Sequence, residues 1–221
     1  MVRPARAVVL RNTVLEPVPG LDGVVLYLAD DALTVWRAVQ LATGDPDTPL
    51  PYWAFAWGGG LAIAHYLQER PAIVAGRRVL DLGSGSGLCA IVAGAAGAAA
   101  VTAVDIDPLA IAAIGLNARA NGRRVGVVRR DLLDEPPPDD VDVILAGDCW
   151  YEAALAERVT HWLRAADAAG IDVLVGDPGR RFLPLDELEQ LATYDVRTTT
   201  ELEDLDRRSS RVYRFGSTPR R

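Results

Sequence analysis

Apolar residues come in short runs along the chain, separated by polar loops. From residue 77 onward, runs typical of buried strands alternate with longer apolar-rich stretches typical of helices. The pattern predicts strands at 79–82, 101–104, 125–128, 141–146 and 171–176, and helices at 87–97, 108–121 and 153–168. Strands that alternate with helices imply a parallel sheet with helices on both faces, which is a Rossmann-like α/β fold.

The two ends of the chain depart from this alternation. Residues 1–50 hold strand-like apolar runs at 8–10 and 24–28 and a helical stretch over 30–40. After the fifth strand, we expect a helix over 185–194 and strands near 195–199 and 212–215. The whole pattern predicts a seven-stranded, mostly parallel sheet in a domain at 51–221, with residues 1–50 as an N-terminal extension that packs on the core.

Charge and cysteine content narrow the classes of function. A net charge of −7 and a pI near 4.9 argue against a nucleic-acid partner held by phosphate neutralisation. Two cysteines are too few for a disulfide framework or a zinc site, so we expect no metal and a reducing cytoplasm. The apolar stretch 88–104 is shorter than the roughly 20 residues of a membrane span. We therefore expect no membrane association and interpret this stretch as a buried helix followed by a strand.

The most informative motif is residues 79–87, where a strand leads into a glycine-rich turn. Gly83 and Gly85 let the backbone approach a ligand closely, and the next helix points free N–H groups at it. Asp81 would repel the pyrophosphate of a dinucleotide but accept a hydrogen bond from a cationic amino group. S-adenosylmethionine (SAM) has such a group and no phosphate, so the motif predicts a methyl-donor site. Residues 85–90 also match G-x-G-x-x-A, which leaves a NAD-dependent oxidoreductase as an alternative.

Acidic residues follow the next two strands, at the sheet edge where ligands bind in such folds. Asp105 lies near the spacing at which an acid holds ribose hydroxyls, whereas Asp107 is expected to cap the next helix, with Pro108 at its first position. After the third strand, Asp131 could accept a hydrogen bond from the adenine amino group while Leu132 packs on the ring. The alternative for Asp131 is a solvated acid at a strand end.

Two further segments are expected to face the transferred methyl group. After the fourth strand, Asp148 can bind an incoming ammonium and help it lose a proton, and the rings of Trp150 and Tyr151 can hold the cation. The alternative for both rings is a place in the core. Before the first predicted strand of the sheet, residues 52–60 carry Trp57 next to three glycines, where the ring could pack on the cofactor. The alternative is a hydrophobic lid that only covers the sheet.

Together these motifs resemble the seven-β-strand class I SAM-dependent methyltransferases, and within them the group containing the lysine methyltransferase of the electron-transfer-flavoprotein β-subunit. The matching pieces are residues 51–57 with 59–60, 79–87, 105–108, 144–151 and 176–180. The resemblance implies SAM contacts by Trp57, Asp81, Gly83, Gly85 and Asp105. It also implies that Asp148 and Tyr151 form an Asp-x-x-Tyr motif that serves a substrate lysine. Gly58 and Glu152 depart from the group, which often has Pro and Asp at these positions.

The sequence therefore predicts a SAM-dependent N-methyltransferase that releases S-adenosylhomocysteine. A protein lysine, with the electron-transfer-flavoprotein β-subunit as the candidate protein, is the favoured acceptor. One alternative is a small amine or a heterocycle such as nicotinamide, which an enclosed pocket beneath residues 52–60 would favour. An open acidic groove would favour a cationic protein segment. Another alternative is a SAM-binding module without catalytic activity.

Overall fold

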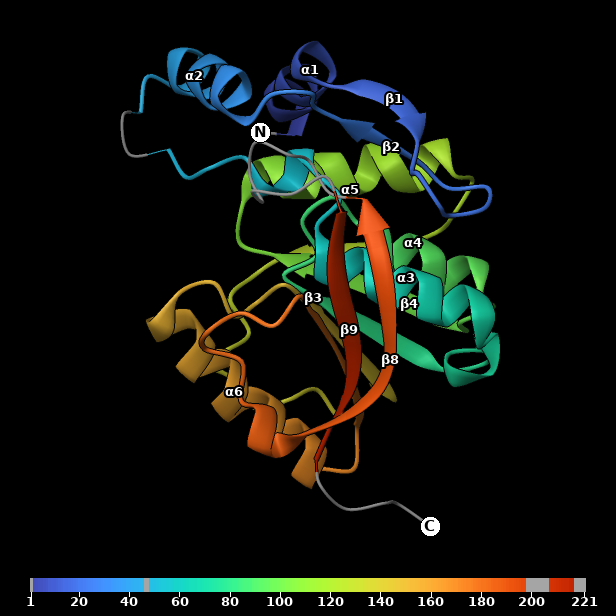
Figure 1. The fold of residues 1–221 in the computed structure, drawn as a ribbon. Coiled ribbons are helices and arrows are strands. Elements are labelled where there is room, and N and C mark those ends of the chain that lie inside the picture. Colours follow the sequence, from blue (N-terminus) through green and yellow to red (C-terminus); the bar gives the residue numbers. More distant parts are fainter. Residues whose placement is uncertain (1, 46–47, 198–206, 217–221) are drawn as a thin grey trace.

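The computed structural model describes residues 2–45, 48–197 and 207–216 (Figure 1). The main sheet contains β3 (Arg78–Leu82), β4 (Ala100–Asp105), β5 (Gly126–Arg129), β6 (Val143–Gly147), β7 (Asp172–Asp177), β8 (Leu188–Arg197) and β9 (Arg207–Phe215). Their order across the sheet is β5-β4-β3-β6-β7-β9-β8. The first five strands in this order run parallel, and β9 pairs antiparallel with both β7 and β8. The Rossmann-like, mostly parallel seven-stranded sheet is thus confirmed.

Helices cover both faces of this sheet. These are α3 (Gly58–Glu69), α4 (Leu88–Ala95), α5 (Pro108–Ala120) and α6 (Ala153–Ala168). Side chains alternate along β3, so that Val79 joins a hydrophobic cluster with α3 and α4, whereas Leu80 and Leu82 join a second cluster with α6. Figure 1 shows α6 on the opposite side of the sheet from α3 and α4. The expected buried helix and strand in 88–104 are therefore α4 and β4. In the described part of the chain, none of the helices has the length and apolar character needed to cross a membrane.

The expected strand-like run at 8–10 is wrong, because these residues belong to helix α1 (Val2–Asn12). Val9 is completely buried, and Val8 packs on the same cluster of residues near α5. A short apolar run cannot by itself distinguish a strand from a buried helical turn. After α1 come the antiparallel hairpin of β1 (Val14–Pro17) and β2 (Val25–Leu28), and then the expected helix, α2 (Ala32–Thr43).

The expected helix over 185–194 is also wrong. A short 3-10 turn, Leu185–Glu187, leads directly into strand β8, which pairs with β9 along its length. The residues of this segment have good helix propensity, but pairing with a partner strand overrides such local preferences. The strand expected near 195–199 is the end of β8 up to Arg197, and residues 198–199 lie outside the described residues. The strand expected at 212–215 is the second half of β9.

The N-terminal elements pack on α5, which lies between them and the rest of the molecule (Figure 1). The fully buried amide of Asn117 in α5 joins two distant segments. Its Oδ1 accepts the N–H of Tyr27 in β2 at 2.7 Å, and its Nδ2 donates to the carbonyl of Ser86 at 2.8 Å. Asn121, one turn further along, makes the same kind of two-way contact with the backbone of Val25. Residues of 1–50 are therefore hydrogen-bonded to the helix that also supports the glycine-rich turn.

Candidate active site

The glycine-rich turn after β3 adopts a backbone that favours glycine. Gly83, Gly85 and Gly87 have positive φ angles of 62°, 55° and 86°, which side chains with a Cβ adopt at a cost. A Cβ on Gly85 would lie 3.9 Å from the carbonyl oxygen of Tyr52 and 4.0 Å from that of Gly83, so it is the positive φ angle rather than crowding that favours glycine here. The turn ends at α4, whose first N–H groups lack partners within the helix.

Asp81 lies beneath this turn and is only 2% exposed. Its Oδ2 accepts the hydroxyl of Ser84 at 2.5 Å and the N–H of Ala90, in the first turn of α4, at 3.0 Å. Burial raises the pKa of Asp81 to about 7, and the nearby carboxylate of Asp105 adds to the rise. A cationic ligand at this position would favour the ionised form of the carboxyl.

Asp105, at the end of β4, contacts the same turn. Its Oδ2 accepts the N–H of Gly85 at 2.9 Å and its Oδ1 accepts the N–H of Asp107 at 2.9 Å. A carboxylate can accept about four hydrogen bonds, so lone pairs remain for the hydroxyls of a ribose. Asp107 accepts the N–H of Leu109 at 2.7 Å, which confirms that it caps α5.

Asp131 and Leu132 lie further from this centre. The carboxylate of Asp131 forms an ion pair at 3.0 Å with Arg158 of α6 and accepts the N–H of Leu133. The side chain of Asp131 is 41% exposed, whereas Leu132 packs against the cluster under α6. The adenine contact expected for these two residues stays a prediction.

An aromatic wall formed by Tyr52, Trp57 and Tyr151 stands next to the glycine-rich turn. The ring centroids of Tyr52 and Tyr151 are 5.2 Å apart, and those of Tyr52 and Trp57 are 5.6 Å apart. The indole N–H of Trp57 donates to the carbonyl of Tyr52 at 2.8 Å, and this carbonyl lies 3.9 Å from an ideal Cβ on Gly85. Trp150 has no exposed surface and donates to Thr160 in α6. Trp150 is thus a core residue, so of the two alternatives for this ring the structure shows the place in the core.

Asp148 follows β6 and sits at the start of α3. Its Oδ2 accepts the N–H of Gly60 at 2.8 Å, and its own N–H donates to the carbonyl of Gly176 at 2.9 Å. Gly59 makes this arrangement possible, because a Cβ on it would lie 2.1 Å from the Gly176 carbonyl oxygen and 2.7 Å from Asp148 Oδ2. The close approach that these glycines allow is therefore between α3 and the sheet.

Two functional candidates, Asp177 and Arg180, received no role from the sequence, although both lie in the matching piece 176–180. Asp177 ends β7 with no exposed surface, and its Oδ1 accepts the N–H groups of Gly179 and Arg180, both at 2.7 Å. Arg180 donates to Asp148 Oδ1 at 2.5 Å and to Asp177 Oδ2 at 3.3 Å. The available signal was an Asp and an Arg at a strand end on the same sheet edge as Asp148.

The acidic residues from four strand ends converge on Cys149. Burial raises the pKa of this thiol, and the carboxylates of Asp148, Asp81, Asp177 and Asp105 raise it further. Its Sγ also lies 3.7 Å from an ideal Cβ on Gly83. The structure therefore brings the residues expected on the cofactor side and those expected on the acceptor side into one site. Within the described ranges, no group of three or more His, Cys, Asp or Glu side chains is arranged to hold a metal ion.

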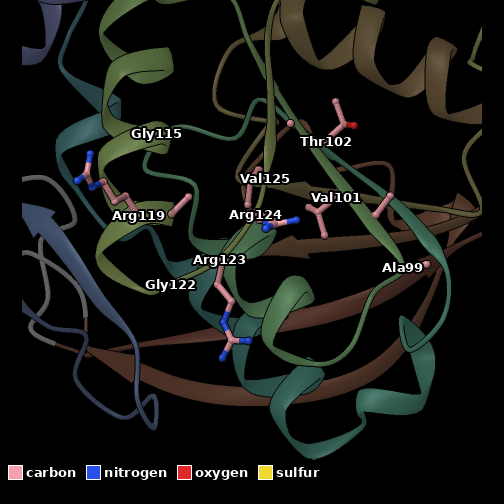
Figure 2. Close-up of a pocket in the computed structure, with 12 residues that line it drawn as sticks. Ala99, Val101, Thr102, Gly115, Arg119, Gly122, Arg123, Arg124 and Val125 are labelled. Atoms are coloured by element: carbon pink, nitrogen blue, oxygen red, sulfur yellow. The ribbon is translucent and has the colours of Figure 1, made fainter.

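An open groove lies elsewhere on the molecule, at the amino ends of β4 and β5 (Figure 2). It is lined in part by Arg119, Arg123 and Arg124. The three side chains point in different directions rather than toward one point (Figure 2). The groove is at the opposite end of these strands from Asp105, so it is separate from the candidate active site.

Comparison with known proteins agrees with this fold. Residues 65–147 match the family model for ribosomal protein L11 methyltransferase (PrmA). The solved structure of magnesium protoporphyrin IX methyltransferase from Synechocystis, with bound SAM, has the same fold. Its TM-score is 0.52 at 18% identity, covering 72% of this chain and 78% of that one. The fold is therefore that of the Rossmann-like methyltransferases.

Two relatives specify the family within this class. The electron transfer flavoprotein beta subunit lysine methyltransferase of Danio rerio is 39% identical over 176 residues, covering 77% of this chain and 68% of the relative. Its homolog from Caenorhabditis elegans is 31% identical over 205 residues, covering 86% and 82%. The chain belongs to the electron transfer flavoprotein beta subunit lysine methyltransferase family.

Proposed function

We propose that this protein transfers the methyl group of SAM to the side-chain nitrogen of a lysine in the electron transfer flavoprotein β subunit. The observation that carries the proposal is the position of Asp148 in one site with the glycine-rich turn, Asp81 and Asp105. Such a site can hold a cationic cofactor and a cationic acceptor side by side. The relatives named for this reaction, at 31% and 39% identity, support the choice of acceptor.

The residues at the turn fit SAM. The glycine-rich turn would let a ligand approach the backbone, the Asp81 carboxylate would accept from the amino group, and Asp105, which already accepts the N–H of Gly85, would accept from the ribose hydroxyls. Trp57 would pack on the cofactor, and Asp131 with Leu132 would contact the adenine. When bound, SAM supplies a methyl group activated on a sulfonium, and S-adenosylhomocysteine is the product.

On the acceptor side, the chain's own residues bind and orient a cation. The ring faces of Tyr52 and Tyr151 would hold the lysine ammonium through cation–π contacts, and the Asp148 carboxylate would accept its N–H groups. Alignment of the nitrogen with the methyl group supplies much of the rate of such a displacement. Tyr52 and Tyr151 are 37% and 46% exposed, which supports a side chain presented by a protein over a small enclosed acceptor.

The overall charge of −7 supports a protein partner with a cationic segment over a nucleic acid. We also infer a cytoplasmic location, supported by the buried and unpaired thiols of Cys89 and Cys149. The NAD-dependent alternative does not fit a member of this methyltransferase family. The small-molecule and non-catalytic alternatives are tested by the following experiment.

The test is incubation of the purified protein with labelled SAM and the electron transfer flavoprotein β subunit, followed by mass spectrometry of the labelled residue. The chain contains no lysine, so methyl-lysine can come only from the acceptor. We expect Asp148→Asn to lower kcat/KM by about 100-fold or more while SAM binding is retained. Asn tolerates the left-handed backbone of this position, which makes it the conservative variant. Label found only in small molecules, or SAM binding without any transfer, would overturn the proposal.

A further inference from the structure

Asp148 has an unusual backbone that several contacts hold in place. Of the non-glycine residues that the structure describes, Asp148 alone has a positive φ angle, which is 61°. Residues other than glycine adopt this conformation uncommonly, and here the surroundings hold it in place. Here the Gly176 carbonyl binds the N–H of Asp148, while Gly60 and Arg180 bind its two carboxylate oxygens. The carboxylate is thus aimed before any acceptor arrives.

Arg180 is itself fixed by Asp177. The Asp177 side chain binds both the backbone N–H and the guanidinium of Arg180. The exposed fraction of the side chain falls from 16% for Arg180 to 11% for Asp148 and 0% for Asp177. An arginine stays protonated throughout the physiological pH range, so this guanidinium is a permanent positive charge next to the carboxylate that would receive the substrate ammonium.

The positive charge of Arg180 affects a necessary part of the proposed reaction, the loss of a proton from the substrate ammonium. A lysine ammonium has a pKa near 10.4 in water, and the nitrogen must lose a proton before its lone pair can form a bond to carbon. Asp148 and Asp177 would stabilise the ammonium and so raise its pKa further. A positive charge close by opposes that rise. We propose that Arg180 is a positioning residue that aims the Asp148 carboxylate and, by its fixed charge, favours the neutral form of the substrate amine.

The inference rests on the proposed function. In the methyl-transfer reaction, the substrate ammonium first releases one proton to solvent. The nitrogen lone pair then forms the N–C bond, the C–S bond breaks with its electron pair going to sulfur, and S-adenosylhomocysteine leaves. Arg180 makes and breaks no bond in this step, and it acts through Asp148 and through its charge.

Other charged groups surround this point from each neighbouring element. The residues after β6 contribute Asp148, Cys149, Tyr151 and Glu152, and the end of β7 contributes Asp177 and Arg180. The aromatic segment contributes Tyr52. Burial and Glu152 raise the pKa of Tyr52, whereas Arg180 lowers it.

The cofactor side contributes Asp81 and Asp105. On β9, a guanidinium nitrogen of Arg211 lies 3.1 Å from an ideal Cβ on Gly179. The start of α3 contributes the N–H of Gly60. Arg180 is the cation in this set that contacts Asp148 directly.

The experiment compares Arg180→Gln and Arg180→Lys in the full chain, by measuring the methylation rate from pH 6 to pH 10 with saturating acceptor. Arg180→Gln should move the rising limb of the profile to higher pH by about one unit and lower the rate at pH 7 about tenfold. Arg180→Lys keeps the charge, so its profile should rise at the wild-type pH. Arg181→Gln is the matched control, because Arg181 is the next residue, is exposed, and lies over the ring of Phe182. It should leave both the rate and the profile unchanged.

The outcomes separate this inference from the proposed function. An Arg180→Gln rate that falls equally at every pH assigns Arg180 a purely structural role and overturns the inference, while methylation by the wild type still supports the proposed function. If the wild type instead methylates a simple primary amine, the same profiles are measured with that amine, so only the proposed acceptor fails. If the wild type methylates no amine, both proposals fail together.

Discussion

At the scale of single residues, burial shifts the titration of the Asp81 carboxyl to near neutral pH. Its side chain is enclosed beneath the glycine-rich turn, where the hydroxyl of Ser84 and the N–H of Ala90 are its hydrogen-bond donors. These two donors favour the ionised form, yet burial outweighs them and leaves a pKa of about 7. In the free protein, this carboxyl therefore titrates near neutral pH, and a bound ammonium would lower its pKa.

With the proposed contact between Asp81 and the amino group of SAM, this titration should make SAM binding depend on pH. Below pH 7, the free protein holds a proton on Asp81 that must leave before the carboxylate can accept from an ammonium. The dissociation constant of SAM should therefore rise about tenfold for each pH unit below 7. Calorimetry between pH 5.5 and pH 7.5 measures this slope. This pH range lies below 7.7–8.0, where an α-amino group titrates.

The control for this prediction is Asp81→Asn. It should bind SAM more weakly at pH 7.5 and show little pH dependence, because the titrating group has been removed. A wild-type dissociation constant that stays level from pH 7.5 to pH 5.5 would contradict the assignment of Asp81 to the cofactor amino group.

At the scale of elements, the approach of α3 to the sheet determines where Asp148 lies. Helix α3 begins with Gly58–Gly60 and crosses β7 at Gly176, where an ideal Cβ would lie only 2.1 Å from the Gly59 carbonyl oxygen. The contact needs glycine on both sides, since either Cβ would meet backbone rather than a flexible side chain. The same contact brings the N–H of Gly60 to the Asp148 carboxylate.

Gly59→Ala should separate α3 from β7. We expect it to lower the free energy of unfolding by about 1–3 kcal/mol, as overpacking of a close contact does, and to lower the methylation rate because the Gly60 N–H moves away from Asp148. Denaturant unfolding and the methylation assay measure the two effects. The matched control is Gly115→Ala in the middle of α5, where a Cβ would meet nothing within 4 Å.

Gly115→Ala should stabilise the protein by about 0.5–1 kcal/mol, because alanine loses less backbone entropy in a helix than glycine does. Its methylation rate should equal that of the wild type. The interpretation of Gly59 would be wrong if the two alanine variants unfolded at the same denaturant concentration.

At the scale of the whole molecule, α5 joins β2 of the N-terminal elements to the glycine-rich turn of the main sheet. Asn117 and Asn121 bind the backbone of β2, and Asn117 also binds Ser86 in the glycine-rich turn. A buried amide that lost one of these partners would leave an unsatisfied group, at a cost of about 1–3 kcal/mol. We therefore expect the extension and the domain to unfold together.

Calorimetric unfolding of the full chain should show a single transition. S-adenosylhomocysteine at 100 times its dissociation constant should stabilise that whole transition by about 2.7 kcal/mol, because it binds only the folded state. Two separate transitions, of which only one responds to the ligand, would show instead that residues 1–50 fold independently of the site.

Much of this architecture could be predicted from the sequence because its signals are local. The alternation of strand and helix from β3 to β7 follows the period of apolar residues, and the glycine-rich turn follows from residues adjacent in the chain. The cap at Asp107 is of the same kind, since its partner is two residues away. Family resemblance added the assignment of the acceptor motif at Asp148 and Tyr151.

The signals that failed are those that depend on distant partners. The apolar run at 8–10 became a helix because it packs on the α5 cluster, and residues 188–194 became a strand because β9 lies beside them. Trp150 carries an aromatic ring next to the site in sequence, but its side chain packs in the core beneath α6. The position of a residue in the sequence does not decide whether its ring points into the site or into the core.

The sequence by itself determined the fold class, the glycine-rich turn and the acidic residues at the strand ends, because local periodicity and backbone preference specify them. Only the tertiary structure decided how these residues combine. Asp148 and Arg180 are 32 positions apart, and Gly60 and Asp148 are 88 positions apart. Their contacts exist because parallel strands end at one edge of the sheet and two glycines let α3 approach it. The aim of the Asp148 carboxylate and the charge beside it are therefore properties of the folded chain.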